Sequence, residues 1–302
     1  MRVLTIVGPT AVGKTSTAID IAGRISGEII SADSRQIYQY LNIGTAKPTD
    51  KQREKVRFHL IDFIHPDDSY SCGQFARDAE AKIEEISARG NAPIVCGGTG
   101  LYIRALFNPL HRLPETNKEI KARLLENLNN YGIEHLYKKL HTIDPEWARQ
   151  ITPKDKQRIV RGLEVYELTG KPLSALIKKK RKKSKHRPLY LGLTIPREEL
   201  YKRINVRFEQ MIDQGLVEEV RSLLERGFNP RSNALRTIGY KEIVEYLQGN
   251  ITLSEARDKA QRHTRNFAKR QITWFSKIRG IQWCNPKELE VIEAIIHQLK
   301  MG

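Results

Sequence analysis

In roughly the first hundred residues, short runs of β-branched and other apolar residues alternate with longer segments whose apolar positions recur at helical spacing. This order predicts a parallel sheet wrapped by helices, since parallel strands are joined by helical crossovers. Strands are expected at residues 3–7, 28–32, 59–64 and 93–96. Between the last two, "FARDAEAKIEEISARG" predicts a helix that ends at Gly90.

The pattern changes between residues 115 and 186, where charged helical segments dominate and strand signals are few. We therefore expect an all-helical insertion domain at 115–186. "RPLYLGLTI" (187–195) predicts a strand that rejoins the sheet, so the α/β core would be discontinuous and formed by 1–114 and 187–302. The remainder is expected to be mostly helical, with breaks at Gly215, Gly227, Gly239 and Gly249.

The net charge of the chain indicates the kind of partner that it binds. The 302 residues contain 52 Lys and Arg against 35 Asp and Glu, a net charge of +17, which favours a polyanion such as nucleic acid. The segment "KKKRKKSKHR" (178–187) is the most basic stretch, and either a flexible arm on tRNA phosphates or a disordered loop would explain it.

Cysteine content and hydropathy indicate the environment in which the protein works. Three cysteines are too few and too scattered for a disulfide framework or a zinc site, which predicts a reducing, cytoplasmic environment. No stretch approaches the roughly 18 apolar residues of a membrane span, so no membrane contact is expected.

A phosphate-binding motif follows the first expected strand. "GPTAVGKT" fits G-x-x-x-x-G-K-[ST] and opens an expected helix, the context that gives this pattern its meaning. Backbone N–H groups and a helix N-terminus would bind phosphates, Lys14 would add a cation, and the Thr15 hydroxyl would hold Mg²⁺. The predicted phosphate site comprises Gly8, Pro9, Thr10, Ala11, Val12, Gly13, Lys14 and Thr15. The loop alone does not distinguish ATP from another diphosphate.

Nucleotide hydrolases with such a loop usually carry a carboxylate for the metal ion at the end of a further strand. The strand at 93–96 runs into "GGTGLY" without an acid, whereas Asp33 directly follows the strand at 28–32. Asp33 could accept a proton from a nucleophile, receive Mg²⁺ through water, or cap an Asx turn. Asp62 falls within the expected strand at 59–64 and could anchor a turn or a basic group.

Seven segments, in order along nearly the whole chain, resemble the tRNA dimethylallyltransferase family. They are "GPTAVGKT" (8–15), "DSRQIY" (33–38), "IGTAKPT" (43–49), "GGTGLY" (97–102), "DKQRIVRGLEVYELTG" (155–170), "IGYKEI" (238–243) and "AKRQITWF" (268–275). The resemblance implies a P-loop kinase-like α/β core with an inserted helical domain. It also implies transfer of a dimethylallyl group from its diphosphate to N6 of adenosine 37, beside the tRNA anticodon. Val12 departs from the family, where serine is frequent.

The same resemblance implies roles for individual residues. Asp33 would be the general base, Lys14 and Thr15 with Mg²⁺ would serve the diphosphate, Thr99 would line the reaction channel, and Arg207 would be a second cation. The tRNA would contact Asp33, Ser34, Arg35, Gln36, Thr99, Gln157, Arg158, Ile159, Val160 and Arg161. Trp274 and Phe275 are expected to pack into the core, and the protein is expected to be a monomer.

Two other functions also fit parts of the sequence. The phosphate loop alone would suit a kinase that uses ATP. The basic composition would suit a non-catalytic RNA-binding protein with a vestigial phosphate site. Incorporation of labelled dimethylallyl diphosphate into tRNA distinguishes both from the transferase.

Overall fold

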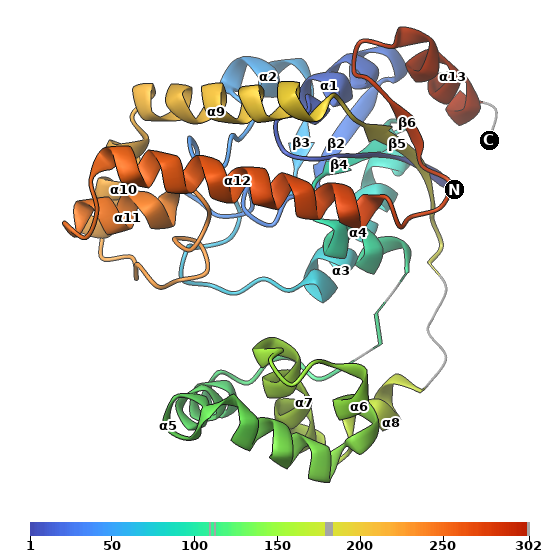
Figure 1. Ribbon diagram of the computed structural model, residues 1–302. Helices are drawn as coiled ribbons and strands as arrows, with labels where there is room; N and C mark the ends of the chain where they lie inside the picture. The colour runs from blue at the N-terminus through green and yellow to red at the C-terminus, as the bar shows by residue number, and fades with distance from the viewer. Residues whose placement is uncertain (109, 112, 179–183, 301–302) are drawn as a thin grey trace. The chain divides into compact units, whose positions relative to one another are not determined.

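The computed structural model describes residues 1–108, 110–111, 113–178 and 184–300 (Figure 1). Two compact units form, one of Met1–Asn108 with Ser184–Gly302 and the other of Pro109–Lys183. The boundaries therefore fall at 108/109 and 183/184, where the sequence placed them at 114/115 and 186/187. Residues just before 187 belong with the first unit because Met1 pairs with them: its ammonium donates to the Lys185 carbonyl at 3.5 Å.

Six strands form a parallel sheet in the order β3-β2-β4-β1-β5-β6. The strands predicted at 3–7, 28–32, 93–96 and 187–195 are confirmed to within two residues at each end. The observed bounds are β1 Arg2–Val7, β2 Gly27–Ser31, β3 Phe58–His59, β4 Ala92–Gly97, β5 Arg187–Leu193 and β6 Gln282–Cys284.

The prediction of a strand at 59–64 is wrong. Only Phe58–His59 pairs with β2, and the chain then turns through Leu60 and Asp62, each with φ of 59°. This left-handed geometry is incompatible with a strand. It points the Asp62 carboxylate at Lys47 and at Arg53, whose Nη2 lies 2.6 Å away. Asp62 is therefore an anchor for basic groups, one of the roles that its sequence context allowed.

Strand β6 was not predicted. It has only three residues, too few for an alternating pattern, and it pairs with β5 at the edge of the sheet.

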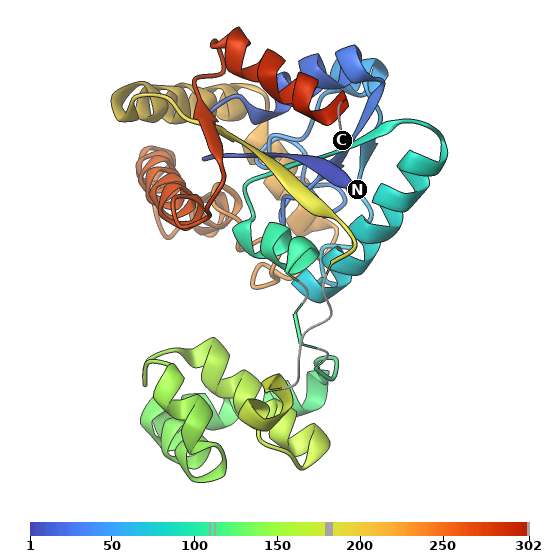
Figure 2. The same ribbon diagram turned by 90° about the vertical axis from the view of Figure 1, so that its right-hand side faces the viewer.

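Helices cover both faces of the sheet (Figure 2). Alternate residues of β1 explain this: Leu4 and Ile6 pack with α1 and α13, whereas Val3 and Val7 pack with α3 and α4. These helices are α1 Lys14–Ile25, α3 Cys72–Ala88, α4 Gly100–Phe107 and α13 Leu289–Lys300. The helix expected at 75–90 is confirmed as α3, which begins earlier because Ser71 and Gln74 form a capping box.

A second apolar cluster joins the segment around Ile37 to the C-terminal helices. These are α9 Arg197–Asp213, α10 Leu216–Glu225, α11 Tyr240–Leu247 and α12 Leu253–Phe275, with the short α2 Asp50–Lys55 elsewhere in the same unit. The predicted breaks at Gly215, Gly227, Gly239 and Gly249 are confirmed, since each has positive φ beyond a helix end or before a start.

The second unit is helical in its described part, as its sequence predicts. Its helices are α5 Lys118–Ile143, α6 Pro145–Gln150, α7 Lys156–Thr169 and α8 Leu173–Ile177. Leu124, Leu140 and Leu163 contribute to an apolar core of its own. Within the basic segment, residues 179–183 lie outside the described residues.

Candidate active site

The phosphate loop connects β1 to α1 at the carboxyl edge of the sheet. Gly8 has φ of 149°, and a Cβ there would lie 2.7 Å from the Leu193 carbonyl oxygen, so only glycine fits without displacement. Gly13 has φ of 106° and is the N-cap of α1. Val12 is fully buried beneath the loop. The loop therefore presents backbone N–H groups and a helix N-terminus at one place.

Two cations converge on this loop. Lys14 Nζ donates to the Pro9 carbonyl at 2.7 Å, and Arg207 Nη2, from α9, donates to Thr10 Oγ1 at 2.6 Å. Burial lowers the pKa of Lys14 to about 8, although the nearby Cys96 and Asp33 act to raise it. Burial likewise lowers the pKa of Arg207, and Asp33 opposes the shift. Both cations are held partly out of water, where an anionic ligand would be bound strongly.

Asp33 faces these cations from the end of β2, and it is half-buried. Its Oδ1 accepts the N–H of Arg35 at 2.8 Å, which is an Asx turn. In the described part of the chain, the other oxygen, Oδ2, accepts no hydrogen bond. The turn thus holds the carboxylate in place and leaves one oxygen for a proton or a hydrated metal, so the turn and the chemical roles are compatible.

Thr99 joins the loop after β4 to the loop after β2. Its Oγ1 accepts the Ser34 N–H at 3.0 Å, and its own N–H donates to the Ala32 carbonyl at 3.1 Å. The close approach requires glycine at 97, where a Cβ would lie 2.2 Å from the Ala32 oxygen. Thr99 and Ser34 are therefore brought together next to Asp33, and their role at the substrate stays a prediction.

Helix α12 carries the segment "AKRQITWF" and contributes to this site Gln271, a residue to which the sequence assigned no role. Gln271 Oε1 accepts the Thr10 N–H at 2.8 Å, and its Nε2 donates to the Gly98 carbonyl at 3.0 Å. One buried side chain thus ties the phosphate loop to the "GGTG" loop. Its neighbour Trp274 lies against Gly100, where a Cβ would be 2.1 Å from the indole Nε1. The sequence signal was the pair of glycines at 98 and 100, which have no room for a side chain.

The expected burial of the two aromatic residues of α12 is half right. Phe275 is fully buried, as predicted. Trp274 is 38% exposed, so the prediction of core packing is wrong for this residue. The helix turns its indole towards the loop edge, where it covers Gly100.

Arg35 and Gln36 use their side chains inside the protein. The Gln36 amide accepts from Ser31 Oγ at 3.0 Å and donates to the Ala46 carbonyl at 3.0 Å. Arg35 Nη1 donates to the Asn233 carbonyl at 2.7 Å. Both residues therefore fix the loop that carries Asp33, and their contact with tRNA stays a prediction.

Thr15 and Asp33 supply oxygen atoms of the kind that Mg²⁺ prefers. Thr15 is half-buried at the start of α1, and its hydroxyl makes no hydrogen bond within the described residues. Mg²⁺ usually binds through one or two protein oxygens together with substrate phosphates. The donor set at this loop fits that pattern.

In the second unit, the five residues expected at the tRNA fall into two groups. Gln157 and Arg158 are exposed on α7. Ile159 and Val160 are 0% and 5% exposed and lie in the apolar core of this unit. Their predicted side-chain contact with tRNA is therefore corrected: a helix that shows Gln157 and Arg158 to solvent turns the next two residues inward.

Arg161 is engaged within its own unit. Its Nη1 pairs with the buried Glu164 at 2.6 Å, and its Nη2 donates to the Pro114 carbonyl at 2.5 Å. Glu164 also accepts the Asn117 N–H at 2.9 Å. Arg161 thus fastens α7 to the segment that precedes α5, and a role at the tRNA stays a prediction.

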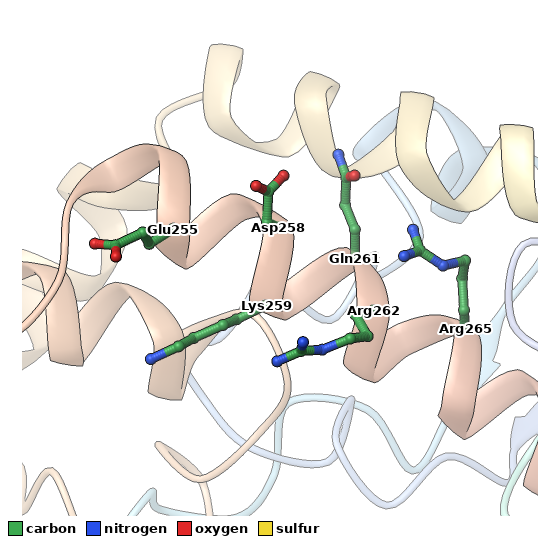
Figure 3. A pocket seen from close by; sticks show the side chains of 6 residues that line it. All are labelled: Glu255, Asp258, Lys259, Gln261, Arg262 and Arg265. Carbon is green, nitrogen blue, oxygen red and sulfur yellow. The ribbon is translucent and has the colours of Figure 1, made fainter.

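A hollow of about 360 Å³ lies on the outer side of α12 (Figure 3). Asp258 and Gln261 point towards α9, where Gln261 Nε2 donates to Glu209 at 2.7 Å. Its other lining residues are Glu255, Lys259, Arg262 and Arg265. None of them is a residue of the phosphate loop or of the loop that contains Asp33. Lys259 pairs with Glu245 of α11, and Arg265 donates to Asn205 of α9. The hollow is therefore separate from the candidate active site.

Comparison with known proteins identifies the family of this chain. The family model described as IPP transferase matches residues 36–278. The chain belongs to the IPP transferase family. The resemblance inferred from the motifs is thereby confirmed. The phosphate loop and Asp33 precede the matched range, but relatives of this IPP transferase-family chain cover them.

Two comparisons with other members span nearly the whole chain. A tRNA dimethylallyltransferase 1 of Syntrophotalea carbinolica is 44% identical over 301 residues, 98% of this chain and 96% of the relative. The crystal structure of the tRNA isopentenylpyrophosphate transferase of Bacillus halodurans is 38% identical, with a TM-score of 0.73, over 99% of this chain and 95% of that one.

A third comparison is with a eukaryotic dimethylallyltransferase that was crystallised acting on tRNA. It is 29% identical, with a TM-score of 0.83, over 99% of this chain and 77% of that one. Separately, the described helices of the present chain include none that is both long and apolar enough to cross a membrane.

Proposed function

We propose that the protein transfers the dimethylallyl group from dimethylallyl diphosphate to N6 of adenosine 37 in tRNA and releases diphosphate. Family membership and the names of the relatives support the reaction class and the tRNA substrate. The observation that carries the chemical assignment is the position of Asp33, opposite two partly desolvated cations at a phosphate loop.

The cationic side of the site suits the departing diphosphate. As the allylic C–O bond breaks, negative charge grows on the leaving oxygen. Backbone N–H groups of residues 11–15, Lys14 and Arg207 would stabilise that charge because they are fixed before the reaction. In this reaction the cradle that serves phosphoryl transfer in kinases would stabilise a leaving group instead.

Asp33 suits the acceptor side. The exocyclic amine of adenine is a weak nucleophile, since its lone pair is delocalised into the ring, and it must lose a proton as the new C–N bond forms. The Oδ2 oxygen would take that proton, while the Asx turn to Arg35 holds Oδ1. Thr99 and Ser34, bonded to one another, would orient the base beside Asp33.

We assign Mg²⁺ to the phosphate loop, where Thr15 would hold it. The ion would supply positive charge to the diphosphate oxygens. Lys14 and Arg207 would add positive charge beside the ion without moving, because their hydrogen bonds to Pro9 and Thr10 already place them on the phosphate loop.

The tRNA would be bound through charge and through base extrusion. The net charge of +17 supplies a non-specific attraction for phosphates that weakens with salt. An adenine inside the anticodon stack must leave it to reach Asp33, and this unstacking costs a few kcal/mol. Exposed Gln157 and Arg158 are the side chains of α7 that we assign to RNA contacts that offset this cost. We assign the active form as a monomer.

The deciding experiment measures incorporation of labelled dimethylallyl diphosphate into tRNA with Mg²⁺, followed by the mass of the modified nucleoside. Asp33→Asn keeps an acceptor for the Arg35 N–H but removes the base, so the turn survives and only the chemistry is tested. We expect turnover to fall by about 10² or more with tRNA affinity unchanged. Asp20→Asn, on the exposed side of α1, is the control.

Three results would contradict the assignment. Wild-type turnover of Asp33→Asn would remove Asp33 from the mechanism. Phosphate transfer from ATP without prenyl transfer would favour the kinase. Binding of tRNA without either reaction would favour the non-catalytic RNA-binding protein.

A further inference from the structure

Glu80, Glu84 and His186 form a cluster that the transfer reaction does not use. Glu80 and Glu84 lie one turn apart on α3, and His186 immediately precedes β5. One potential ligand atom of each residue lies within 4.8 Å of those of the other two. No other group of three such side chains occurs among residues whose placement the structure gives.

The cluster is remote from the phosphate loop. Arg187, the first residue of β5, pairs with Arg2 at the amino edge of the sheet, whereas the loop leaves the carboxyl end of β1. A ligand bound by the cluster would therefore meet neither the diphosphate nor Asp33.

His186 distinguishes the cluster from an ordinary group of surface carboxylates, because its imidazole is buried and unpartnered among the described residues. The residue is only 7% exposed, yet both ring nitrogens are buried and have no hydrogen-bond partner among the described residues. A buried polar group without a partner is destabilising by roughly 1–3 kcal/mol, so such groups normally have a partner. Burial also lowers the pKa of His186, which favours the neutral imidazole that metals bind.

The charged surroundings of His186 are mixed. Glu80 and Glu84 favour a cation, whereas Lys185 and the N-terminal ammonium oppose one. Lys185 Nζ pairs with Glu84 Oε1 at 3.0 Å. Because Glu84 and Lys185 are both exposed, this pair can open at little cost, and the Glu84 carboxylate can then turn towards the imidazole.

We propose that Glu80, Glu84 and His186 bind a divalent transition-metal ion with the ligand preferences of Zn²⁺. Imidazole with carboxylates is a donor set that suits Zn²⁺, whereas Mg²⁺ prefers oxygen alone. Bond lengths of about 2.0–2.2 Å require the three atoms to draw in by roughly 1 Å, which is within the reach of the two glutamates. Three protein ligands leave one position for water.

Such an ion would link α3 to the segment through which the chain enters β5. The two ligating segments are about a hundred residues apart in sequence, and the whole of residues 109–183 lies between them. The ion would therefore close a long loop of the chain and stabilise the first unit without taking part in transfer.

The test uses the full-length protein without a polyhistidine tag, in excess Mg²⁺ so that the phosphate loop is supplied with its own ion. Co²⁺ absorption and Zn²⁺ titration calorimetry report binding, and thermal unfolding with and without Zn²⁺ reports stabilisation. Glu84→Gln, an exposed position, and His186→Leu remove one ligand each. Glu85→Gln is the matched control, because this neighbour pairs with Lys82 and Arg89 instead.

We expect one equivalent of Co²⁺ with visible ligand-field bands and a rise in unfolding temperature with Zn²⁺. Both ligand variants should bind at least about tenfold more weakly, and Glu85→Gln should behave like wild type. Absence of binding would overturn the proposal, as would binding that both ligand variants retain. A resonance shift of the His186 imidazole on Zn²⁺ addition is expected in wild type, and its absence would also overturn it.

Discussion

Replacing Gln271 with methionine should damage the reaction without unfolding the protein. The side chain is 6% exposed and joins the phosphate loop to the "GGTG" loop through Thr10 N–H and the Gly98 carbonyl. Methionine has nearly the same volume and no polar end, so packing is kept while both hydrogen bonds are lost. The change therefore isolates the link between the loops.

The structure sets the size of the effect. Thr10 is half-buried and water can replace its partner, whereas Gly98 is buried, so most of the penalty comes from the Gly98 carbonyl. Leaving one buried group unpaired destabilises the fold by about 1–3 kcal/mol. Loss of registration between the two loops should reduce kcat/KM by about 10- to 100-fold, equivalent to about 1.4–2.7 kcal/mol of transition-state stabilisation.

The assay compares steady-state dimethylallyl transfer and chemical unfolding in Gln271→Met, Gln261→Met and wild type. Gln261 lies on the same helix and makes one side-chain hydrogen bond, to Glu209, away from both loops. The Gln261→Met variant should therefore keep the wild-type kcat/KM. The reasoning is refuted if Gln271→Met is folded and transfers at the wild-type rate, or if both variants lose activity equally.

Three further predictions rest on other parts of the chain. Because the pKa of Lys14 is about 8, the KM for dimethylallyl diphosphate should rise as pH increases through 8, and Lys14→Arg should abolish that rise in a pH profile. Ile159→Ala should destabilise the second unit by about 2–5 kcal/mol, measured by urea unfolding, whereas Gln157→Ala should only weaken tRNA binding. Hydrogen bonds from Asn91, His59 and Arg89 outweigh burial and lower the pKa of Glu28 from 4.5 to about 2. Its contribution of roughly 3 kcal/mol should be complete above pH 4.5 and lost towards pH 2, so acid unfolding of Glu28→Gln should show a flatter pH dependence.

Most strand positions were predictable from sequence because the buried strands carry short, mainly apolar runs that end at glycine or a polar residue. The same signal failed at 59–64, where apolar residues flank Asp62. Pairing of Asp62 with Lys47 and Arg53 requires a turn, and those two bases come from an earlier segment whose approach is a tertiary event. Strand β6 was missed for a different reason: three residues are too few to show the alternation of apolar and polar positions that identifies a strand.

For the candidate site, motif residues could be named in advance, but their contacts could not. The sequence places Asp33 after a strand and leaves open whether it caps a turn or faces a reactant. The structure shows that Oδ1 caps the turn while Oδ2 remains available, so the alternatives were not exclusive. Ile159 and Val160 show the converse: a motif can be recognised as a block although only some of its residues reach the surface.

The arrangement of α12 explains why two of the glycines in "GGTG" are needed at all. A Cβ at Gly98 would meet Gln271 Nε2 at 2.1 Å, and one at Gly100 would meet Trp274 Nε1 at 2.1 Å. These distances are set by a helix that begins more than 150 residues later in the chain. Their backbone torsions are not left-handed, so turn geometry alone does not demand glycine at either position. A side chain at Gly98 would displace the Gln271 amide and one at Gly100 would meet the Trp274 ring, so both glycines permit the packing of α12 that brings Gln271 within hydrogen-bond distance of the phosphate loop. The phosphate loop and the Thr99 loop are thus positioned by one helix, and the geometry of Asp33, Lys14 and Arg207 depends on that contact as much as on the motifs themselves.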